Sequence, residues 1–279
     1  MRVSEVDHCA FCPRLCRHAC PVAVGSAREA AVPAVIMADV YAWIVGTGSA
    51  ADAARAAALC TSCGACTRAC KLERPVSDLL ARVRATAGPP PRVEEPAEID
   101  GAGDLVAVET DERRWSAALG RRLGVAVARL PTRDELGRAL IGHPEAFAVH
   151  ARRLRAVVGL RTLVAPSRGV EAVAAEAGIA CRPLSSFVQV DPTLPAVPRC
   201  GAADNSEQLG CCGAAPPLST HHPDIAATVG AEAARRLGGL RHSAEDAVCA
   251  AALRRHGAAV EDLVTRLLAA VSPDGAAAG

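Results

Sequence analysis

The chain has 279 residues, enough for one large domain or two modest ones, and 51% of them are hydrophobic, so a sizeable core can be buried. Aromatic residues make up only 2%, so that core must consist mainly of alanine, valine and leucine. The formal net charge is +1, with acidic and basic residues interspersed. This composition lacks the basic patch of a nucleic-acid-binding protein, and we expect no nucleic-acid partner.

The amino-terminal segment carries charges and cysteines where a secretory signal would carry an apolar run. The most apolar stretch, residues 30–48, is interrupted by Pro33 and Asp39, and it is too broken for a membrane span of about 20 residues. We therefore predict a cytoplasmic protein without a transmembrane segment, and we leave peripheral association with a membrane partner open. Thirteen cysteines in such a chain argue against a disulfide framework.

Eight of the cysteines form two dense groups near the amino terminus. The first group is Cys9, Cys12, Cys16 and Cys20, and the second is Cys60, Cys63, Cys66 and Cys70. The second spacing is that of bacterial ferredoxins, in which three cysteines of a run hold one iron–sulfur cluster and the fourth completes the other cluster. We therefore predict two [4Fe–4S] clusters, with these ligands: Cys9, Cys12, Cys16 and Cys70 for cluster 1, and Cys60, Cys63, Cys66 and Cys20 for cluster 2. The alternative is structural zinc, which usually takes two cysteine pairs separated by a dozen or more residues.

Helical spacing accompanies both groups. Cys12, Cys16 and Cys20 recur every four residues, and the last three cysteines of the second group lie at i, i+3 and i+7. Each set is therefore predicted to line one face of a helix. Residues 33–43 and 50–59 are also predicted to be helical. Residues 1–87 should then form an all-helical, ferredoxin-like domain.

A proline-rich segment, residues 88–103, is predicted to be an interdomain linker, because serial prolines cannot continue a helix. Beyond it, short apolar runs alternate with Ala/Arg-rich stretches, which is typical of βαβ units. The expected strands are residues 105–108, 125–128, 162–165 and 247–249. Residues 104–271 should form an α/β domain and residues 272–279 a disordered tail, so the fold class is α+β.

The α/β region contains an internal repeat with an offset of 79 residues. His143-Pro144-Glu145 and His222-Pro223-Asp224 each predict a helix start, because proline suits the first helical position and an acid suits the helix dipole there. The same offset aligns Thr132-Arg133-Asp134 with Cys211-Cys212-Gly213. We therefore predict a duplicated α/β unit whose second copy carries thiols that the degenerate first copy lacks.

The remaining cysteines allow two interpretations. Four of them belong to the second copy: Cys200, Cys211, Cys212 and Cys249. They could hold a third metal ion or iron–sulfur cluster, or they could be buried free cysteines that pack as small hydrophobic residues. Cys181 lies outside this pattern and is expected in the core. No GxGxxG motif links a strand to a helix, so we expect no bound nucleotide or flavin.

Five basic or titratable side chains lie among the N-terminal cysteines: His8, His18, Arg14, Arg17 and Arg68. They could offset cluster charge, tune its potential or meet an acidic partner. The ordinary alternative is a solvated surface position.

These cysteine runs give the chain a resemblance to the iron–sulfur subunits related to heterodisulfide reductase, a family that includes the small subunit of anaerobic glycerol-3-phosphate dehydrogenase. The resemblance implies an N-terminal helical di-cluster domain followed by two "CCG" domains. This sequence departs from the pattern at several positions. Lys71 replaces a proline after the last cysteine, Thr132-Arg133-Asp134 replaces the first CCG, and Ala165 and Ala252 stand at later cysteine positions.

The functional hypothesis is an electron-transfer subunit that relays electrons between a flavoprotein dehydrogenase, or another redox protein, and a further carrier. The alternatives are a catalytic subunit that reduces a disulfide or quinone with Cys211 and Cys212, and a non-catalytic subunit whose CCG domain only binds partners.

Overall fold

The computed structural model describes most of the N-terminal region and parts of the remainder. The described residues are 1–13, 16–87, 99–100, 104–109, 125–129, 143–165, 168–183, 186, 193–197, 211–214, 218–244, 246–263 and 265–266. The predicted tail, Thr132-Arg133-Asp134, Cys200 and Arg14 lie outside these residues. The same is true of most of the predicted linker.

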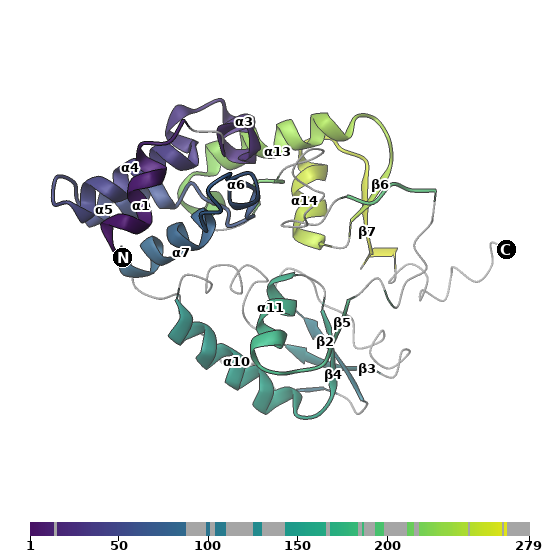
Figure 1. Ribbon diagram of the computed structural model, residues 1–279. Helices are drawn as coiled ribbons and strands as arrows, with labels where there is room; N and C mark the ends of the chain where they lie inside the picture. Colours follow the sequence, from purple (N-terminus) through teal and green to yellow (C-terminus); the bar gives the residue numbers. More distant parts are fainter. Residues whose placement is uncertain are drawn as a thin grey trace.

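The N-terminal region is entirely helical in its described part (Figure 1). Its elements are α1 (Val3–Ala10), α2 (Cys16–Ala19), α3 (Pro21–Ser26), the 3₁₀ turn η1 (Glu29–Ala31), α4 (Pro33–Ile44), α5 (Ala50–Ala57), α6 (Ala65–Arg68) and α7 (Val76–Ala87). The predicted helices at residues 33–43 and 50–59 are confirmed as α4 and α5. Pro33 occupies the first turn of α4, and the Ser49 side chain accepts a hydrogen bond from the Asp52 N–H at the start of α5.

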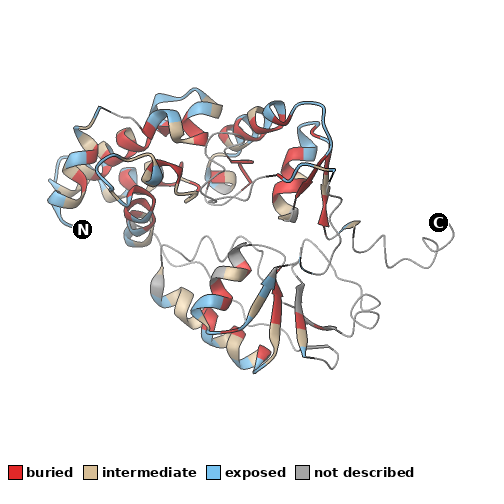
Figure 2. Ribbon diagram, turned by 45° about the vertical axis from the view of Figure 1, so that its right-hand side comes forward, coloured by how far each residue is buried: buried red, intermediate tan, exposed pale blue. Residues whose placement is uncertain are grey.

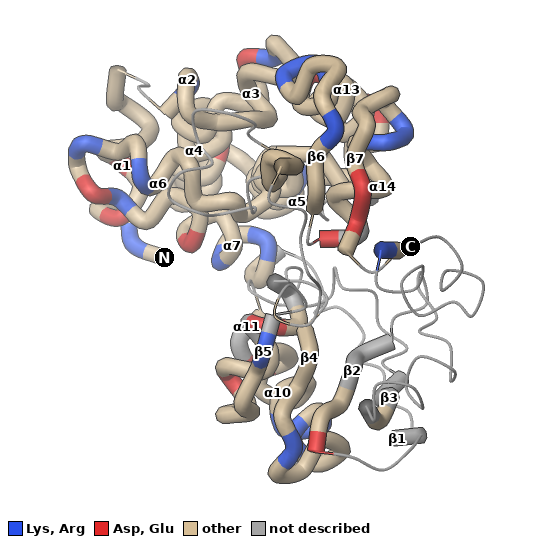
Figure 3. Tube along the Cα trace, turned by 90° about the vertical axis from the view of Figure 1, so that its right-hand side faces the viewer, with Lys and Arg blue, Asp and Glu red and all other residues tan. Residues whose placement is uncertain are grey.

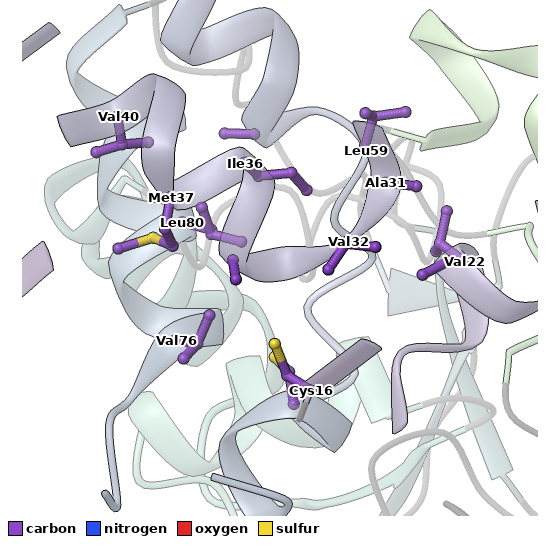
Figure 4. Close-up of a cluster of buried hydrophobic side chains, with 14 of the residues drawn as sticks. Cys16, Val22, Ala31, Val32, Ile36, Met37, Val40, Leu59, Val76 and Leu80 are labelled. Atoms are coloured by element: carbon purple, nitrogen blue, oxygen red, sulfur yellow. The ribbon is translucent and has the colours of Figure 1, made fainter. Parts of the chain in front are cut away.

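The core of this region consists of small and aliphatic side chains, as the composition requires. Ile36, Met37 and Val40 of α4 pack with Leu80 of α7, and Cys16 lies at the edge of the same group (Figure 4). All but Cys16 are at most 1% exposed. Burial of such side chains contributes roughly 1.5–3 kcal/mol each relative to an exposed position, so α4 and α7 form a firm base for the cysteine-bearing segments.

A first α/β unit follows, with a five-stranded sheet in the order β1-β3-β2-β4-β5. Its elements are β1 (Ile99–Asp100), β2 (Leu105–Glu109), β3 (Val125–Arg129), α10 (Pro144–Val158), β4 (Thr162–Ala165), α11 (Arg168–Glu176) and β5 (Cys181–Pro183). The strands pair in parallel except β1, which is antiparallel to β3. Three predicted strands are confirmed as β2, β3 and β4. The edge strand β1 lies within residues 88–103, which we predicted to be a linker.

A second, smaller α/β unit contains α12 (Leu218–His221), α13 (Pro223–Leu237), β6 (His242–Ala244), α14 (Ala247–Arg255) and β7 (Val260–Asp262). Strands β6 and β7 pair in parallel, and Ala196 bridges Ser243 of β6. The predicted strand at residues 247–249 is wrong, because these residues form the first turn of α14. The Asp246 side chain accepts hydrogen bonds from the N–H groups of Val248 and Cys249, so helix capping outweighs the short apolar run.

The two units repeat the same succession of elements. Displacing α10, α11 and β5 by 79 residues gives the bounds of α13, α14 and β7, and β6 corresponds to the last three residues of β4. Hydrogen bonds recur at the same offset: the Leu163 N–H donates to the Ala180 carbonyl at 2.8 Å, and the His242 N–H donates to the Ala259 carbonyl at 2.9 Å. At this offset the counterpart of Cys249 is Val170 of α11, not Ala165 as the sequence suggested.

The helical region packs against the second α/β unit. Helix α3 lies beside α13, where an added Cβ on Gly25 would come within 3.1 Å of the Val229 Cα. Side chains of Cys211, Leu218, Ile225 and Val229 belong to the same buried cluster as the helical region. The first unit has a separate core, seen in the lower part of Figure 2. Segments at the two ends of the described chain are therefore joined more closely than segments adjacent in sequence.

Charged residues of both signs are spread over all three parts of the molecule (Figure 3). Within the described ranges, no helix is both long enough and apolar enough to cross a bilayer.

Candidate metal centre

The first cysteine group is distributed over the ends of short helices. Cys9 lies in the last turn of α1, Cys12 in the following turn, Cys16 at the start of α2, and Cys20 at the N-cap position of α3. Pro21 then occupies the first turn of α3. The predicted single helix face is therefore wrong for this group, because the described chain leaves helical geometry between the cysteines.

The second group begins in a loop. Cys60 and Cys63 precede α6, Cys66 lies within that four-residue helix, and Cys70 follows it. A single helix face is again wrong, since the backbone takes the left-handed conformation at Ser62 (φ +56°) and Gly64 (φ +74°). These two positions turn the chain sharply and allow its N–H groups to face a sulfur. The Ser62 N–H donates to the Cys60 Sγ at 3.3 Å.

The fold brings cysteines of the two groups together in two mixed sets. Cys9 interacts electrostatically with Cys70, Cys12 and Cys16. Cys66 interacts with Cys60, Cys20 and Cys63, and more weakly with Cys16. We call the first four residues thiol set 1 and the second four thiol set 2. Each set thus contains three cysteines of one run and the last cysteine of the other run. Within the described ranges, no three His, Cys, Asp or Glu side chains converge tightly enough to chelate a single metal ion.

Both sets are partly withdrawn from water. Burial, together with the neighbouring thiols of set 1, raises the pKa of Cys9 to about 11. Burial also raises the pKa of Cys20 to about 12, with contributions from Cys63 and Cys60. Burial raises the thiol pKa of Cys16 and Cys66 as well. Four neighbouring thiolates that are partly withdrawn from water repel one another, and bound iron would relieve that repulsion, because a coordinated thiol is deprotonated. The donor sets therefore fit an iron–sulfur cluster.

Helix α7 holds the loop of thiol set 2 through one side chain. Arg84 Nη2 donates to Ser62 Oγ at 2.6 Å, and Nη1 donates to the carbonyls of Ala57 at 3.0 Å and Cys60 at 3.4 Å. Arg84 was not predicted from the sequence. The feature that marks it is its place four positions after Leu80, on the face of α7 that is otherwise apolar.

The other polar residues near the cysteines lie at the surface. Arg74 contacts the exposed His8, with Nη2 3.0 Å from Nδ1, and the Asp7 carboxylate lies 2.7 Å from the same nitrogen. Arg17 pairs with Glu29. Arg68 donates to the Cys63 carbonyl at 3.4 Å, and His18 is exposed. Arg74 electrostatically stabilises the thiolate of Cys9.

The described C-terminal cysteines are buried in two cores. Cys211 is 1% exposed and lies in the core shared with the helical region. Cys212, 4% exposed, and Cys249 lie in the core of the second α/β unit. Cys181 packs partly buried against the core of the first unit, as expected.

Glycines shape the Cys211-Cys212-Gly213 segment. Gly213 has φ +76°, and a Cβ there would lie 2.3 Å from the Ala226 carbonyl oxygen of α13. A Cβ on Gly230 would lie 3.0 Å from the Cys212 carbonyl oxygen. Close approach of this segment to α13 therefore requires glycine at both positions.

Comparison with known families identifies the N-terminal region. Residues 5–73 match a family described as a 4Fe–4S dicluster domain, and this range includes all eight cysteines of the two thiol sets. The match supports an iron–sulfur protein with two [4Fe–4S] clusters. It covers neither α/β unit. Searches of curated proteins and of solved structures gave no match.

Proposed function

We propose that this chain is an iron–sulfur electron-transfer subunit in which thiol set 1 and thiol set 2 each hold one [4Fe–4S] cluster. The observation that carries the proposal is the exchange of the last cysteine between the two runs. It gives two complete four-thiol sets inside the range that matches the dicluster domain. When bound, each cluster accepts or releases one electron at a time.

The chain's own residues would then perform three tasks. The thiols hold the clusters, and the packed aliphatic side chains around Cys16 and Cys66 keep most water away from them. Peptide N–H groups such as that of Ser62 stabilise negative charge on sulfur. Juxtaposition of the two sets, with Cys16 close enough to interact with Cys66, supports electron passage between them.

The proposed partner is a cytoplasmic flavoprotein dehydrogenase or another redox protein. The clusters held by the N-terminal cysteines would transfer single electrons, so a partner protein would perform the hydride chemistry. We further propose that the two α/β units are copies of a CCG-type domain. The 79-residue recurrence of their elements supports this assignment. The second copy would dock the helical domain, since it shares that domain's core.

Anaerobic purification tests the cluster assignment. We expect about eight iron and eight sulfide per chain, and a signal from interacting reduced clusters in electron paramagnetic resonance after dithionite treatment. A colourless product that contains zinc would remove the proposal.

Serine substitutions test the exchange of ligands between runs. Cys70→Ser should damage the same cluster as Cys9→Ser, and Cys20→Ser should damage the same cluster as Cys66→Ser. Cys181→Ser is the matched control, because Cys181 lies in the separate core of the first α/β unit. If Cys20→Ser and Cys9→Ser instead abolish the same signal, the ligand sets are wrong.

The disulfide- or quinone-reducing alternative would use Cys211 and Cys212 together. Their burial in two different cores favours relay, because a substrate would need access to both sulfurs. Cys212→Ser should therefore leave both N-terminal clusters and the rate of electron transfer unchanged. Loss of turnover with intact clusters would favour the catalytic alternative. Unchanged turnover together with loss of partner capture would favour the binding-only alternative.

A further inference from the structure

An arginine side chain supports the backbone loop of thiol set 2. The guanidinium of Arg84 spans the loop that carries Cys60 and Cys63, with hydrogen bonds to two carbonyls and to Ser62 Oγ. Among the described residues, no carboxylate forms an ion pair with Arg84. The arginine of set 1, Arg74, is in a different situation, because it also interacts with the Asp7 carboxylate.

Arg84 also determines the backbone geometry that faces a ligand sulfur. Ser62 has φ +56°, a conformation that a non-glycine residue adopts only where its surroundings enforce it. The bond of 2.6 Å from Arg84 to Ser62 Oγ fixes that residue on one side. The Ser62 N–H then points at the Cys60 Sγ. One side chain thus brings both a positive charge and an oriented N–H group to the same thiolate.

Net charge and hydrogen bonds to sulfur are two of the properties that set the potential of an iron–sulfur cluster. Both act in one direction, because each stabilises the additional negative charge of the reduced form. We propose that Arg84 is a positioning residue that raises the reduction potential of the cluster in thiol set 2. This inference rests on the proposed function.

The test is a redox titration of the whole chain, followed by electron paramagnetic resonance, with iron content measured on the same samples. Cys9→Ser and Cys66→Ser assign each signal to its set. In Arg84→Gln we expect the midpoint potential of the set 2 cluster to shift to more negative values, while that of set 1 stays unchanged. Arg84→Lys should restore part of the shift, because lysine returns the charge without the planar, bidentate donor geometry.

Two further variants separate charge from orientation. Ser62→Gly keeps the peptide N–H and tolerates positive φ but removes the hydroxyl that Arg84 holds, so we expect a smaller negative shift than in Arg84→Gln. Arg82→Gln is the matched control, since Arg82 lies on the same helix, is exposed and pairs with Glu5. It should leave both potentials unchanged.

The outcomes distinguish this inference from the proposed function. Wild-type protein without clusters removes the proposed function. An Arg84→Gln variant with full iron and an unchanged set 2 potential overturns the inference alone. A shift of both clusters by the same amount also overturns it. If Arg84→Gln loses iron, the set 2 potentials of Arg84→Lys and Ser62→Gly test the inference instead. Both should be more negative than in the wild type, and unchanged values overturn the inference.

Discussion

The two α/β units share their succession of elements, but they differ in what covers the first helix of each. In the second unit, Val229 of α13 packs against α3 of the helical region. At the equivalent position of α10, the first unit has His150, which is 3% exposed. Its Nδ1 has no hydrogen-bond partner among the described residues. Valine at position 229 and histidine at position 150 thus accompany the difference between the two units. The second unit shares a core with the iron–sulfur region, and the first keeps a core of its own.

Iron removal should have the largest effect on amide hydrogen exchange. It should also show the clearest difference between the two units. Cys20 is both a proposed ligand of thiol set 2 and the N-cap residue of α3, which packs on α13. Anaerobic treatment with a chelator should therefore lower amide hydrogen-exchange protection in α3 and α13, while β4 and α10 keep theirs. Equal loss of protection in α10 and α13 would show that the comparison is wrong.

Gly213→Ala should have the next largest effect and should act on the second unit. A Cβ would meet the Ala226 carbonyl oxygen at 2.3 Å, in addition to the strain of alanine at φ +76°. We expect a loss of at least about 2 kcal/mol in the free energy of unfolding, measured by chemical denaturation. Gly238→Ala is the control, because φ is +65° there and nothing lies within 4 Å of the added Cβ. If both variants lose the same amount, the close approach contributes nothing.

Val229→Ala should weaken the contact between α3 and α13 by about 2 kcal/mol, because it removes two buried methyl groups and leaves a cavity. Val158→Ala is matched to it, since both side chains are 1% exposed but Val158 lies in the core of the first unit. Hydrogen exchange should report the first variant in α3 and α13 and the second in α10 and α11. An effect of Val229→Ala on the first unit alone would contradict the packing described here.

His150→Val should have the smallest effect, and it should depend on pH. Burial lowers the pKa of His150, with a further contribution from Arg153. The unfolded chain therefore binds a proton more readily than the native one. The stabilising contribution is present above the unfolded pKa of about 6.5 and is lost as the pH falls below it. His150→Val should remove this acid sensitivity from α10, which thermal unfolding at pH 5 and pH 7.5 would reveal. An unchanged pH dependence would assign the sensitivity to another group.

Much of the framework could be predicted from the sequence. Local signals predicted α4, α5, the strands β2 to β4 and, through the His-Pro-acid starts, the first turns of α10 and α13. The strand expected at residues 247–249 is wrong. A helix that begins directly after an N-cap at Asp246 starts with the same short apolar run as a strand. The correct strand, β6, lies five residues earlier and carries His242 and Ser243, which give no alternating apolar pattern.

The grouping of the thiols could be predicted from the sequence, but the side chains that support them could not. The ferredoxin-like spacing predicted which thiols should meet, and the fold brings the same sets together. Helical spacing misled the local prediction, because i, i+3 and i+4 intervals also occur in chains that turn around a compact group. Arg84 acts over 22 residues on Ser62, and no pattern in one sequence signals that pairing.

The joining of α3 to α13 makes the iron–sulfur region and the second unit a discontinuous domain, with the first unit inserted between its two parts. The core of this domain contains side chains from both parts, so neither part can complete it alone. The arrangement also means that a nascent chain cannot complete the core around Val22 and Val229 until its last third has been synthesised.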